Sequence, residues 1–145
     1  KHQNKNLKKI IFLCTGNSCR SQMAVGFAHQ TIGDEESLIE SAGVRAYRMN
    51  PIAVKVMEEV GIDITTQISK KISSINLNIF DIIVTLCEQA METCPIVLHK
   101  KIVNPVTIGG TEDEKLLMYR QVTNEIRDIM INLLNNYYSI CQERN

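Results

Sequence analysis

The chain has 145 residues and a mass of 16.4 kDa, which predicts one domain and leaves little room for a second. Hydrophobic residues make up 44% and charged residues 22%, and 16 basic side chains balance 16 acidic ones, so no net charge attracts nucleic acid or an anionic membrane. Every apolar stretch is too short to span a bilayer and no apolar signal core follows the polar start, so we expect a cytoplasmic protein with an ordinary core.

Apolar runs and helix-start signals predict strands that alternate with helices. In chain order these are a strand at 9–14, a helix at 21–32, a strand at 38–44, a helix at 51–60, strands at 80–87 and 96–103, and a terminal helix after 111. Short apolar runs bounded by turn residues are typical of buried strands. Asn50 followed by Pro51 marks the start of the second helix, and Gly61 is expected as its C-cap. Residues 65–77 and 104–110 are expected to form loops, the first with a short helical turn.

The terminal helix begins with a capping-box pattern, Thr111 to Glu114. Apolar residues then recur at helical spacing, which predicts that they face the sheet. They are Leu117, Val122, Ile126, Ile129, Met130 and Leu133. The whole pattern predicts a single α/β domain over residues 1–145, with residues 1–7 as a flexible tail. We expect a four-stranded parallel sheet with helices on both faces.

The chain has five cysteines. Because we expect no export signal, a disulfide framework is disfavoured, and thiol chemistry or metal binding becomes the question. Zinc is the metal alternative. Four residues separate Cys14 from Cys19, and six separate Cys87 from Cys94, and both spacings fit zinc poorly. We therefore expect no metal and no cofactor. Cys141 has no motif around it and is interpreted as incidental.

Residues 14–21, Cys-Thr-Gly-Asn-Ser-Cys-Arg-Ser, connect a predicted strand to a predicted helix. Backbone N–H groups of such a loop can converge on an anion, and the helix start adds positive potential. Arg20 can bind two oxygens of a tetrahedral anion. The same field favours the nucleophilic thiolate of Cys14, to which Ser21 can donate a hydrogen bond. The predicted oxyanion site consists of Thr15, Gly16, Asn17, Ser18, Cys19, Arg20 and Ser21.

The alternative for this loop is a buried structural cysteine beside a surface arginine. The strand before the loop, the Gly-Asn turn within it and the helix after it are what anion binding at a helix start requires. That context disfavours the structural alternative. Cys14 and Cys87 both lie at the carboxyl ends of predicted strands, and ligands of parallel α/β sheets bind beyond those ends.

Cys87 and Cys94 are seven positions apart, directly before Pro95. Seven residues of helix rise about 10.5 Å, whereas a disulfide needs Cα atoms within about 7 Å. A bond between these cysteines therefore requires the segment between them to unwind, which Pro95 makes easier. The pair is either a redox pair that is also a conformational switch, or two cysteines that merely pack on one helical face.

Residues 11–24 resemble the phosphate loop shared by low-molecular-weight tyrosine phosphatases and thioredoxin-linked arsenate reductases. The continuation Gln22-Met23-Ala24 looks more like the reductases. Further similar segments cover most of the chain, at residues 41–43, 50–51, 81–87, 94–95 and 110–127. The resemblance implies a low-molecular-weight phosphatase-like fold that binds arsenate, phosphate or a phosphoester.

For the reductase branch, the resemblance implies a relay of three cysteines. Cys14 attacks arsenate, Cys87 attacks the thiol–arsenic adduct and releases arsenite, and Cys94 takes over the disulfide and presents it to thioredoxin or a related thiol reductant. Tyrosine phosphatases of this fold have no need of the last two cysteines. We therefore expect a cytoplasmic arsenate reductase with residual phosphatase activity. The neutral net charge and the lack of an obvious exposed apolar stripe make a monomer the default.

Asn104-Pro105 stands where both branches normally have Asp-Pro, with the aspartate as general acid. An amide cannot donate a catalytic proton as a carboxylic acid does. A phenolate leaving group, whose parent pKa is about 10, needs that proton more than arsenate does, because arsenate carries its own hydroxyls. Two alternatives stay open: a phosphatase acting on phosphotyrosine or a small phosphoester, and a catalytically weak anion-binding homologue.

Some members of the resembled family bind potassium beside the loop, through the residue matching Asn17 and two carboxylates. The chain has Val25 and Lys70 at the two carboxylate positions. One hypothesis is that the Lys70 ammonium replaces the ion and holds Asn17 in place. The alternative is a solvated lysine, which is the norm for that residue.

Overall fold

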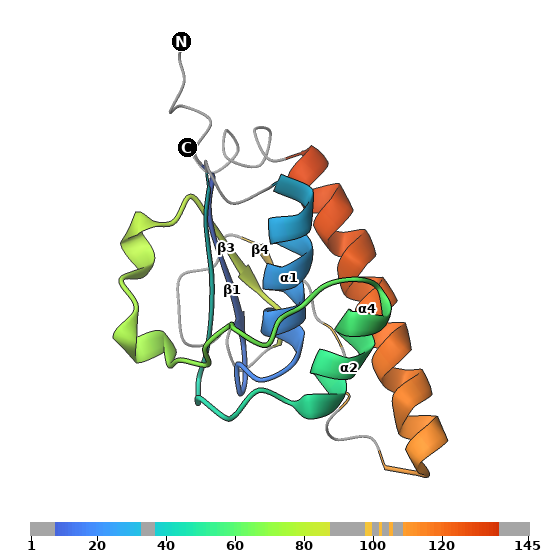
Figure 1. Ribbon diagram of the computed structural model, residues 1–145. Coiled ribbons are helices and arrows are strands. Elements are labelled where there is room, and N and C mark those ends of the chain that lie inside the picture. Colours follow the sequence, from blue (N-terminus) through green and yellow to red (C-terminus); the bar gives the residue numbers. More distant parts are fainter. Residues whose placement is uncertain are drawn as a thin grey trace.

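A parallel β-sheet with α-helices packed on one side forms the body of the chain in the computed structural model (Figure 1). The structure describes residues 8–32, 37–87, 98–99, 102, 105 and 109–136. The strands run parallel in the order β2-β1-β3-β4. They are β1 (Lys8–Cys14), β2 (Ser37–Gly43), β3 (Ile82–Thr85) and β4 (Leu98–His99). The expected parallel α/β architecture is therefore confirmed.

Three α-helices and two 3-10 helices connect and cover these strands. The α-helices are α1 (Arg20–Ile32), α2 (Pro51–Glu59) and α4 (Glu112–Asn135), and the 3-10 helices are η2 (Ile72–Ser74) and η3 (Leu77–Ile79). Asn50 caps α2 as predicted, because its Oδ1 accepts the N–H groups of Ile52 and Ala53 at 2.8 and 3.2 Å. Val60 is the C-cap of α2, and Gly61 follows it with a φ of 84°. None of the helices in the described part of the chain combines the length and apolarity that a membrane span needs.

The fourth strand is shorter than predicted. β4 has two residues, which pair with Val84 and Thr85 at the end of β3, and β3 itself has four residues and offers little further length to pair with. The rest of the 96–103 stretch, apart from residue 102, lies outside the described residues. The described sheet thus has three longer strands and a two-residue edge, instead of four full strands.

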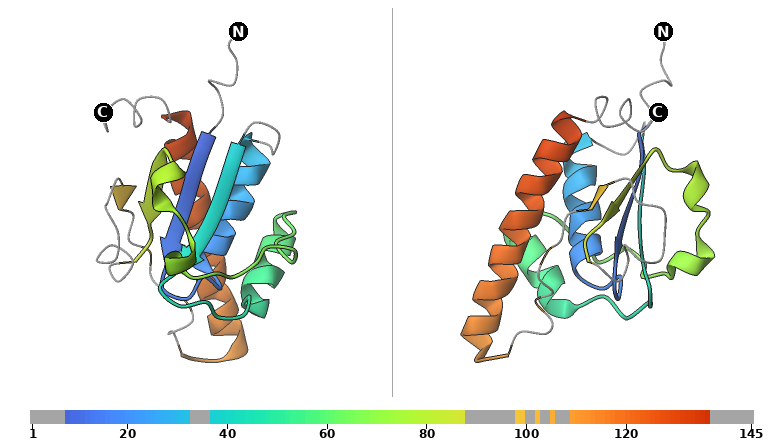
Figure 2. Two further views of the ribbon diagram at one scale, coloured as in Figure 1. Left: turned by 90° about the vertical axis from the view of Figure 1, so that its left-hand side faces the viewer. Right: turned by 180° about the vertical axis from the view of Figure 1, so that it is seen from behind.

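The prediction of helices on both faces holds in the described part of the chain only with 3-10 helices on one of the faces. All three α-helices lie on one side of the sheet, and η2 and η3 lie on the other (Figures 1 and 2). These 3-10 helices belong mainly to the segment expected to be a loop with a helical turn. They cover their face with little buried apolar surface, since Ile72 is the one buried residue of the two.

The sheet brings Cys14 and Cys87 to one edge. β1 lies between β2 and β3, and its Ile10, Ile11, Phe12 and Leu13 are fully buried, as expected for a central strand covered on both faces. Cys14 is the last residue of β1, and Cys87 comes two residues after β3. Because parallel strands end at the same edge, both thiols stand at the carboxyl end of the sheet, as predicted.

The terminal helix packs against other helices rather than directly on the sheet. Its capping box is confirmed by hydrogen bonds of 3.1 Å from Glu114 N–H to Thr111 Oγ1 and 2.8 Å from Thr111 N–H to Glu114 Oε1. Four residues of the predicted stripe are buried against the helical layer, namely Val122, Ile126, Met130 and Leu133. Ile129 is half-buried. Leu117 is 56% exposed, because it lies five positions before Val122 and hence on another face of the helix.

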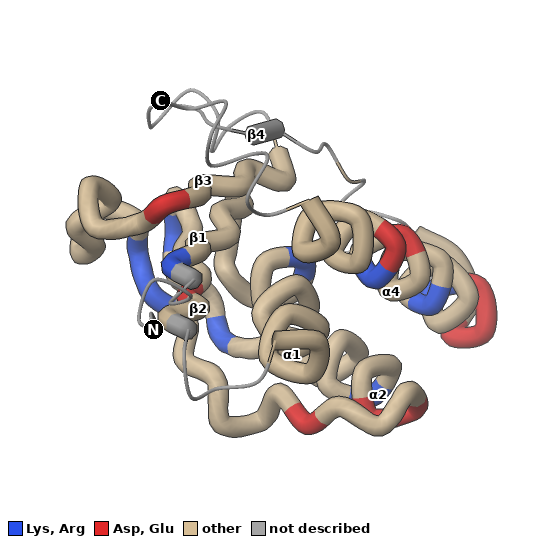
Figure 3. The backbone as a smooth tube through the Cα atoms, turned by 90° about the horizontal axis from the view of Figure 1, so that it is seen from above, with Lys and Arg blue, Asp and Glu red and all other residues tan. Residues whose placement is uncertain are grey.

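The outer side of the helical layer carries charges of both signs, spread along α2 and α4 (Figure 3). Arg120 of α4 donates two hydrogen bonds of 2.9 Å to the carboxylate of Glu59 in α2. Both side chains are substantially exposed, so this bidentate pair orients the two helices more than it stabilises them.

Candidate functional site

The 14–21 loop is oriented by hydrogen bonds to its carbonyl groups. Val44, Arg45, Tyr47 and Asn50 donate their backbone N–H groups to the carbonyls of Cys14, Thr15, Gly16 and Ser18, respectively, over 2.8 to 3.1 Å. Gln22 Nε2 donates to the remaining carbonyl, that of Asn17, at 2.9 Å. Every carbonyl from residue 14 to residue 18 thus points to the outside of the loop.

These outward carbonyls determine where the loop's N–H groups point. No peptide bond is cis among the described residues, and in a trans peptide the N–H is directed opposite to the carbonyl of the preceding residue. The N–H groups of residues 15–19 are therefore turned to the inside of the loop, at the start of α1. Converging N–H groups at a helix N-terminus form an anion-binding site.

Asn17 gives the loop its turn. Its φ of 52° is in the left-handed region, where asparagine is tolerated better than most residues, and the residue is fully buried. Asn17 Oδ1 accepts the backbone N–H of Lys70 at 2.7 Å, and Asn17 Nδ2 donates to Ser21 Oγ at 2.7 Å. The side chain thus connects the loop to the 67–70 segment and to the first turn of α1.

The hydroxyl of Ser21 lies beside the thiol of Cys14. The distance from Ser21 Oγ to Cys14 Sγ is 2.9 Å, and both residues are buried. Because Asn17 Nδ2 already donates to Ser21 Oγ, the hydroxyl hydrogen is available for the sulfur. Ser21 can therefore donate to a Cys14 thiolate, as the sequence predicts.

Two further loop residues differ sharply in what they can do. Arg20 is buried, and its guanidinium donates to the carbonyl of Ile102 at 3.0 Å and approaches Thr15 Oγ1 at 3.5 Å, which holds the group beside the loop. Burial, reinforced by Cys14 and opposed by Arg20, raises the pKa of Cys19 to about 12. Cys19 therefore stays a thiol at neutral pH and packs in the core, which leaves Cys14 as the loop's nucleophile.

The structure brings Cys87 to the same loop. Its Sγ lies 3.1 Å from the hydroxyl oxygen of Thr15, although 72 positions separate the two residues in the chain. Cys87 is 8% exposed. Cys94, Asn104 and Cys141 lie outside the described residues, so their roles stay predictions. In the part of the chain that is described, no three His, Cys, Asp or Glu side chains gather to hold a metal ion.

Lys70 contacts Asn17 differently from the hypothesis. The Lys70 ammonium pairs with Glu40 Oε1 at 2.9 Å and lies 3.5 Å from the carbonyl of Ile68, whereas the contact with Asn17 is made by the backbone N–H. The ammonium therefore does not hold Asn17 directly. Glu40 was missed by sequence reasoning, although a carboxylate in the middle of a strand was a usable signal.

We expect that replacing Lys70 with methionine lowers the free energy of unfolding by less than about 1 kcal/mol, because both partners of the ion pair are partly exposed. The variant leaves the Glu40 carboxylate without its cation, and a potassium ion should then take the place of the ammonium. Phosphate affinity should therefore become stronger in KCl than in NaCl at equal ionic strength. Wild-type affinity should be the same in both salts. Isothermal titration with inorganic phosphate measures this, and a potassium-dependent wild type would contradict the replacement of an ion by lysine.

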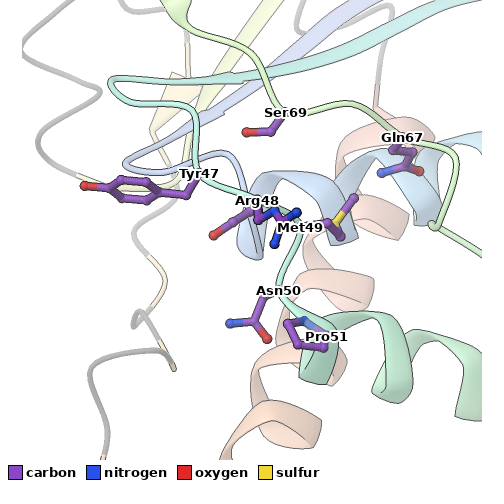
Figure 4. A pocket seen from close by; sticks show the side chains of 8 residues that line it. Tyr47, Arg48, Met49, Asn50, Pro51, Gln67 and Ser69 are labelled. Carbon is purple, nitrogen blue, oxygen red and sulfur yellow. The ribbon is translucent and has the colours of Figure 1, made fainter.

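Two hollows with shared lining residues open at the loop. The smaller, of about 80 Å³, is lined by Cys14, Thr15, Gly16, Ser18, Cys19, Arg20 and Tyr47. The larger, of about 910 Å³, runs between the 47–51 and 67–69 segments and shares Ser18 and Tyr47 with the smaller one (Figure 4). Its lining residues are Ser18, Tyr47, Arg48, Met49, Asn50, Pro51, Gln67 and Ser69, with no carboxylate among them. Tyr47, which no local motif indicated, packs against Gly16 so closely that a Cβ there would meet its ring at 2.6 Å.

Comparison with known proteins is consistent with this geometry. The profile of the family described as low molecular weight phosphotyrosine protein phosphatase matches residues 9–138. A protein of Bacillus subtilis (strain 168) named arsenate reductase is 49% identical over 125 residues, which cover 82% of this chain and 89% of the relative. A solved arsenate reductase in the phosphate binding state is 33% identical, with a TM-score of 0.72 over 89% of this chain and 98% of that one. Another, in the oxidized state, is 32% identical, with a TM-score of 0.76 and the same coverage.

Proposed function

We propose that this chain, which belongs to the low molecular weight phosphotyrosine protein phosphatase family, reduces arsenate to arsenite. The observation that carries the proposal is the second thiol at the oxyanion loop, Cys87, in contact with the Thr15 hydroxyl at 3.1 Å. Hydrolysis of a phosphoester needs one cysteine nucleophile, whereas reduction of As(V) needs two electrons and hence a second thiol. The names of the relatives support the same activity.

In the first step, the inward N–H groups of residues 15–19 and the Arg20 guanidinium bind the arsenate oxygens. Donors fixed in this way need no reorganisation when charge develops on the oxyanion. The Cys14 thiolate, which accepts a hydrogen bond from Ser21, attacks arsenic. A sulfur–arsenic bond forms, an arsenic–oxygen bond breaks, and the oxygen leaves as water after taking up protons from the substrate hydroxyls or from solvent.

The second step moves the electrons. The Cys87 thiolate attacks the Cys14 sulfur, the electron pair of the sulfur–arsenic bond passes to arsenic, and arsenite leaves as As(III). The two thiols are thereby oxidised to a Cys14–Cys87 disulfide. Cys94 then attacks Cys87, which frees Cys14 and leaves a Cys87–Cys94 disulfide for the dithiol of thioredoxin to reduce. A cytoplasmic protein is the matching expectation, because the relay needs a reducing compartment to reset it. A monomer is the expectation from the neutral net charge.

A single-turnover experiment tests this proposal. Reduced protein mixed with excess arsenate should release one arsenite per chain and carry a Cys87–Cys94 disulfide by peptide mass spectrometry, and addition of thioredoxin, its reductase and NADPH should give continuous turnover. Aryl phosphate hydrolysis without arsenite would identify a phosphatase. Phosphate binding without either reaction would identify an anion-binding homologue.

We expect that replacing Asn104 with aspartate raises aryl phosphate hydrolysis about 10²-fold or more, the usual range for a general acid. Arsenate reduction should change only a few-fold, since arsenate carries its own protons. Initial rates with an aryl phosphate and with arsenate measure the two effects. Asn104→Ala is the control, which should give neither gain. An equal gain in both reactions would contradict the assignment of position 104 to leaving-group protonation.

A further inference from the structure

We infer that Gln22 and Gln67 are positioning residues for the Cys14 nucleophile, because their paired side-chain amides fix the backbone of Asn17 and, through it, the hydrogen bond that Ser21 offers to Cys14. The inference rests on the proposed function only in taking Cys14 as the nucleophile. The two glutamine side chains act on Cys14 indirectly, because their hydrogen bonds go neither to the Cys14 sulfur nor to the N–H groups of residues 15–19.

The carboxamide of Gln22 has a partner at each of its polar atoms. Gln22 is fully buried, and its Nε2 donates to the carbonyls of Asn17 and Ile68 at 2.9 and 3.2 Å. Its Oε1 accepts from Gln67 Nε2 at 2.8 Å, and the same Gln67 nitrogen donates to the Gln22 backbone carbonyl at 2.9 Å. Only an amide can donate to two carbonyls and accept from a third group at once, so this site discriminates against glutamate and against apolar side chains of the same size.

Asn17 needs this support because of its conformation. A non-glycine residue in the left-handed region is held there by its surroundings, and the Asn17 carbonyl is the one loop carbonyl from residue 14 to residue 18 that is bound by a side chain instead of the 44–50 backbone. If this peptide rotated, the Ser18 N–H would leave the inside of the loop. The Asn17 amide would also lose its alignment with Ser21 Oγ.

The hydrogen bonds run in one direction toward the sulfur. Gln67 donates to Gln22, Gln22 donates to Asn17, and Asn17 donates to Ser21, whose hydroxyl hydrogen is then directed at Cys14. The series starts on the 67–70 segment. Gln67 lies there in the wall of the larger hollow, opposite residues 47–51 (Figure 4). The orientation of the nucleophile thus depends on a segment about fifty positions away in the chain.

The test uses Gln22→Met and Gln67→Met, which keep side-chain length and remove the amide, with Gln30→Met on the exposed side of the same helix as the control. The rate of Cys14 alkylation by iodoacetamide is measured against pH by mass spectrometry of the 10–20 peptide, with and without inorganic phosphate. Cys19, in the same peptide, stays a thiol because of its raised pKa of about 12. Arg20, Tyr47 and Cys87, the other charged or titratable groups at the loop, are unchanged in all variants.

For Gln22→Met we expect the alkylation profile to move to higher pH, because a misaligned Ser21 hydroxyl stabilises the thiolate less. The phosphate concentration that halves the alkylation rate of Cys14 should rise about tenfold, because the loop binds the anion more weakly. Gln67→Met should shift both readouts in the same direction by less, and Gln30→Met should shift neither. Unchanged readouts in folded Gln22→Met would overturn the inference, and so would unchanged readouts in Gln67→Met if Gln22→Met fails to fold. Neither readout uses arsenate, so a wild type that cannot reduce arsenate would refute the proposed function without affecting this test.

Discussion

Replacing Cys87 with serine is expected to abolish arsenate turnover with thioredoxin, by about 10³-fold or more, while aryl phosphate hydrolysis and phosphate binding stay near wild type. Serine is nearly the same size and can keep the contact with the Thr15 hydroxyl, which lies 3.1 Å from the sulfur. It cannot form a disulfide, so the electron pair has no route from the Cys14 adduct to a second sulfur. Parallel assays of NADPH consumption with arsenate and of aryl phosphate hydrolysis measure the two activities.

Two further variants sharpen this result. Cys94→Ser should still release one arsenite per chain, but should stop at a Cys14–Cys87 disulfide that peptide mass spectrometry detects. Cys141→Ser, a thiol outside any motif, is the control and should turn over at the wild-type rate. If arsenate reduction survives in Cys87→Ser, the three-cysteine mechanism is wrong and an external thiol must attack the adduct.

The parts of the site that sequence reasoning predicted are local in the chain. Residues 14–21 carry their own turn, nucleophile and helix start, and the Asn50 and Thr111 caps are complete within four residues. Such features depend on hydrogen bonds between near neighbours, so a short motif contains the information that builds them. The position of Cys87 at the loop edge also followed, because parallel strands end at one edge of a sheet.

The parts that were missed depend on contacts between distant segments. Tyr47 packs on Gly16, Glu40 pairs with Lys70, and Gln67 bonds to Gln22, and no spacing rule connects the members of these pairs. The same holds for Leu117, whose exposure depends on which side of α4 meets α1 and α2. Periodicity identified the apolar stripe of that helix, but it did not identify the surface against which the stripe packs.

The close approach of β2 to the loop leads to the second large effect. Gly43, the last residue of β2, would place an added Cβ 2.5 Å from the Arg45 carbonyl oxygen, 2.7 Å from the Asn17 nitrogen and 2.9 Å from the carbonyl carbon of Gly16. All three are backbone atoms, so no side-chain rotation can relieve the overlap. Gly43 also donates its N–H to the Lys70 carbonyl at 2.9 Å, which prevents the strand end from moving away.

Gly43→Ala should therefore lower the free energy of unfolding by about 1–3 kcal/mol, the usual cost of an overpacked site. It should also weaken phosphate binding by more than about tenfold, because a loss of about 1.4 kcal/mol in anion contact already corresponds to a tenfold change in affinity. Both effects follow from one overlap, because one of the atoms that the new Cβ displaces is the Asn17 backbone nitrogen, whose N–H faces the anion. Guanidinium denaturation measures the stability, and phosphate titration measures the binding.

Gly109→Ala, where an added Cβ meets nothing within 4 Å, is the matched control and should change neither the stability nor the phosphate affinity. A Gly43→Ala protein that loses stability but binds phosphate normally would mean that the strain is absorbed by β2, and that the loop's N–H groups do not depend on its packing.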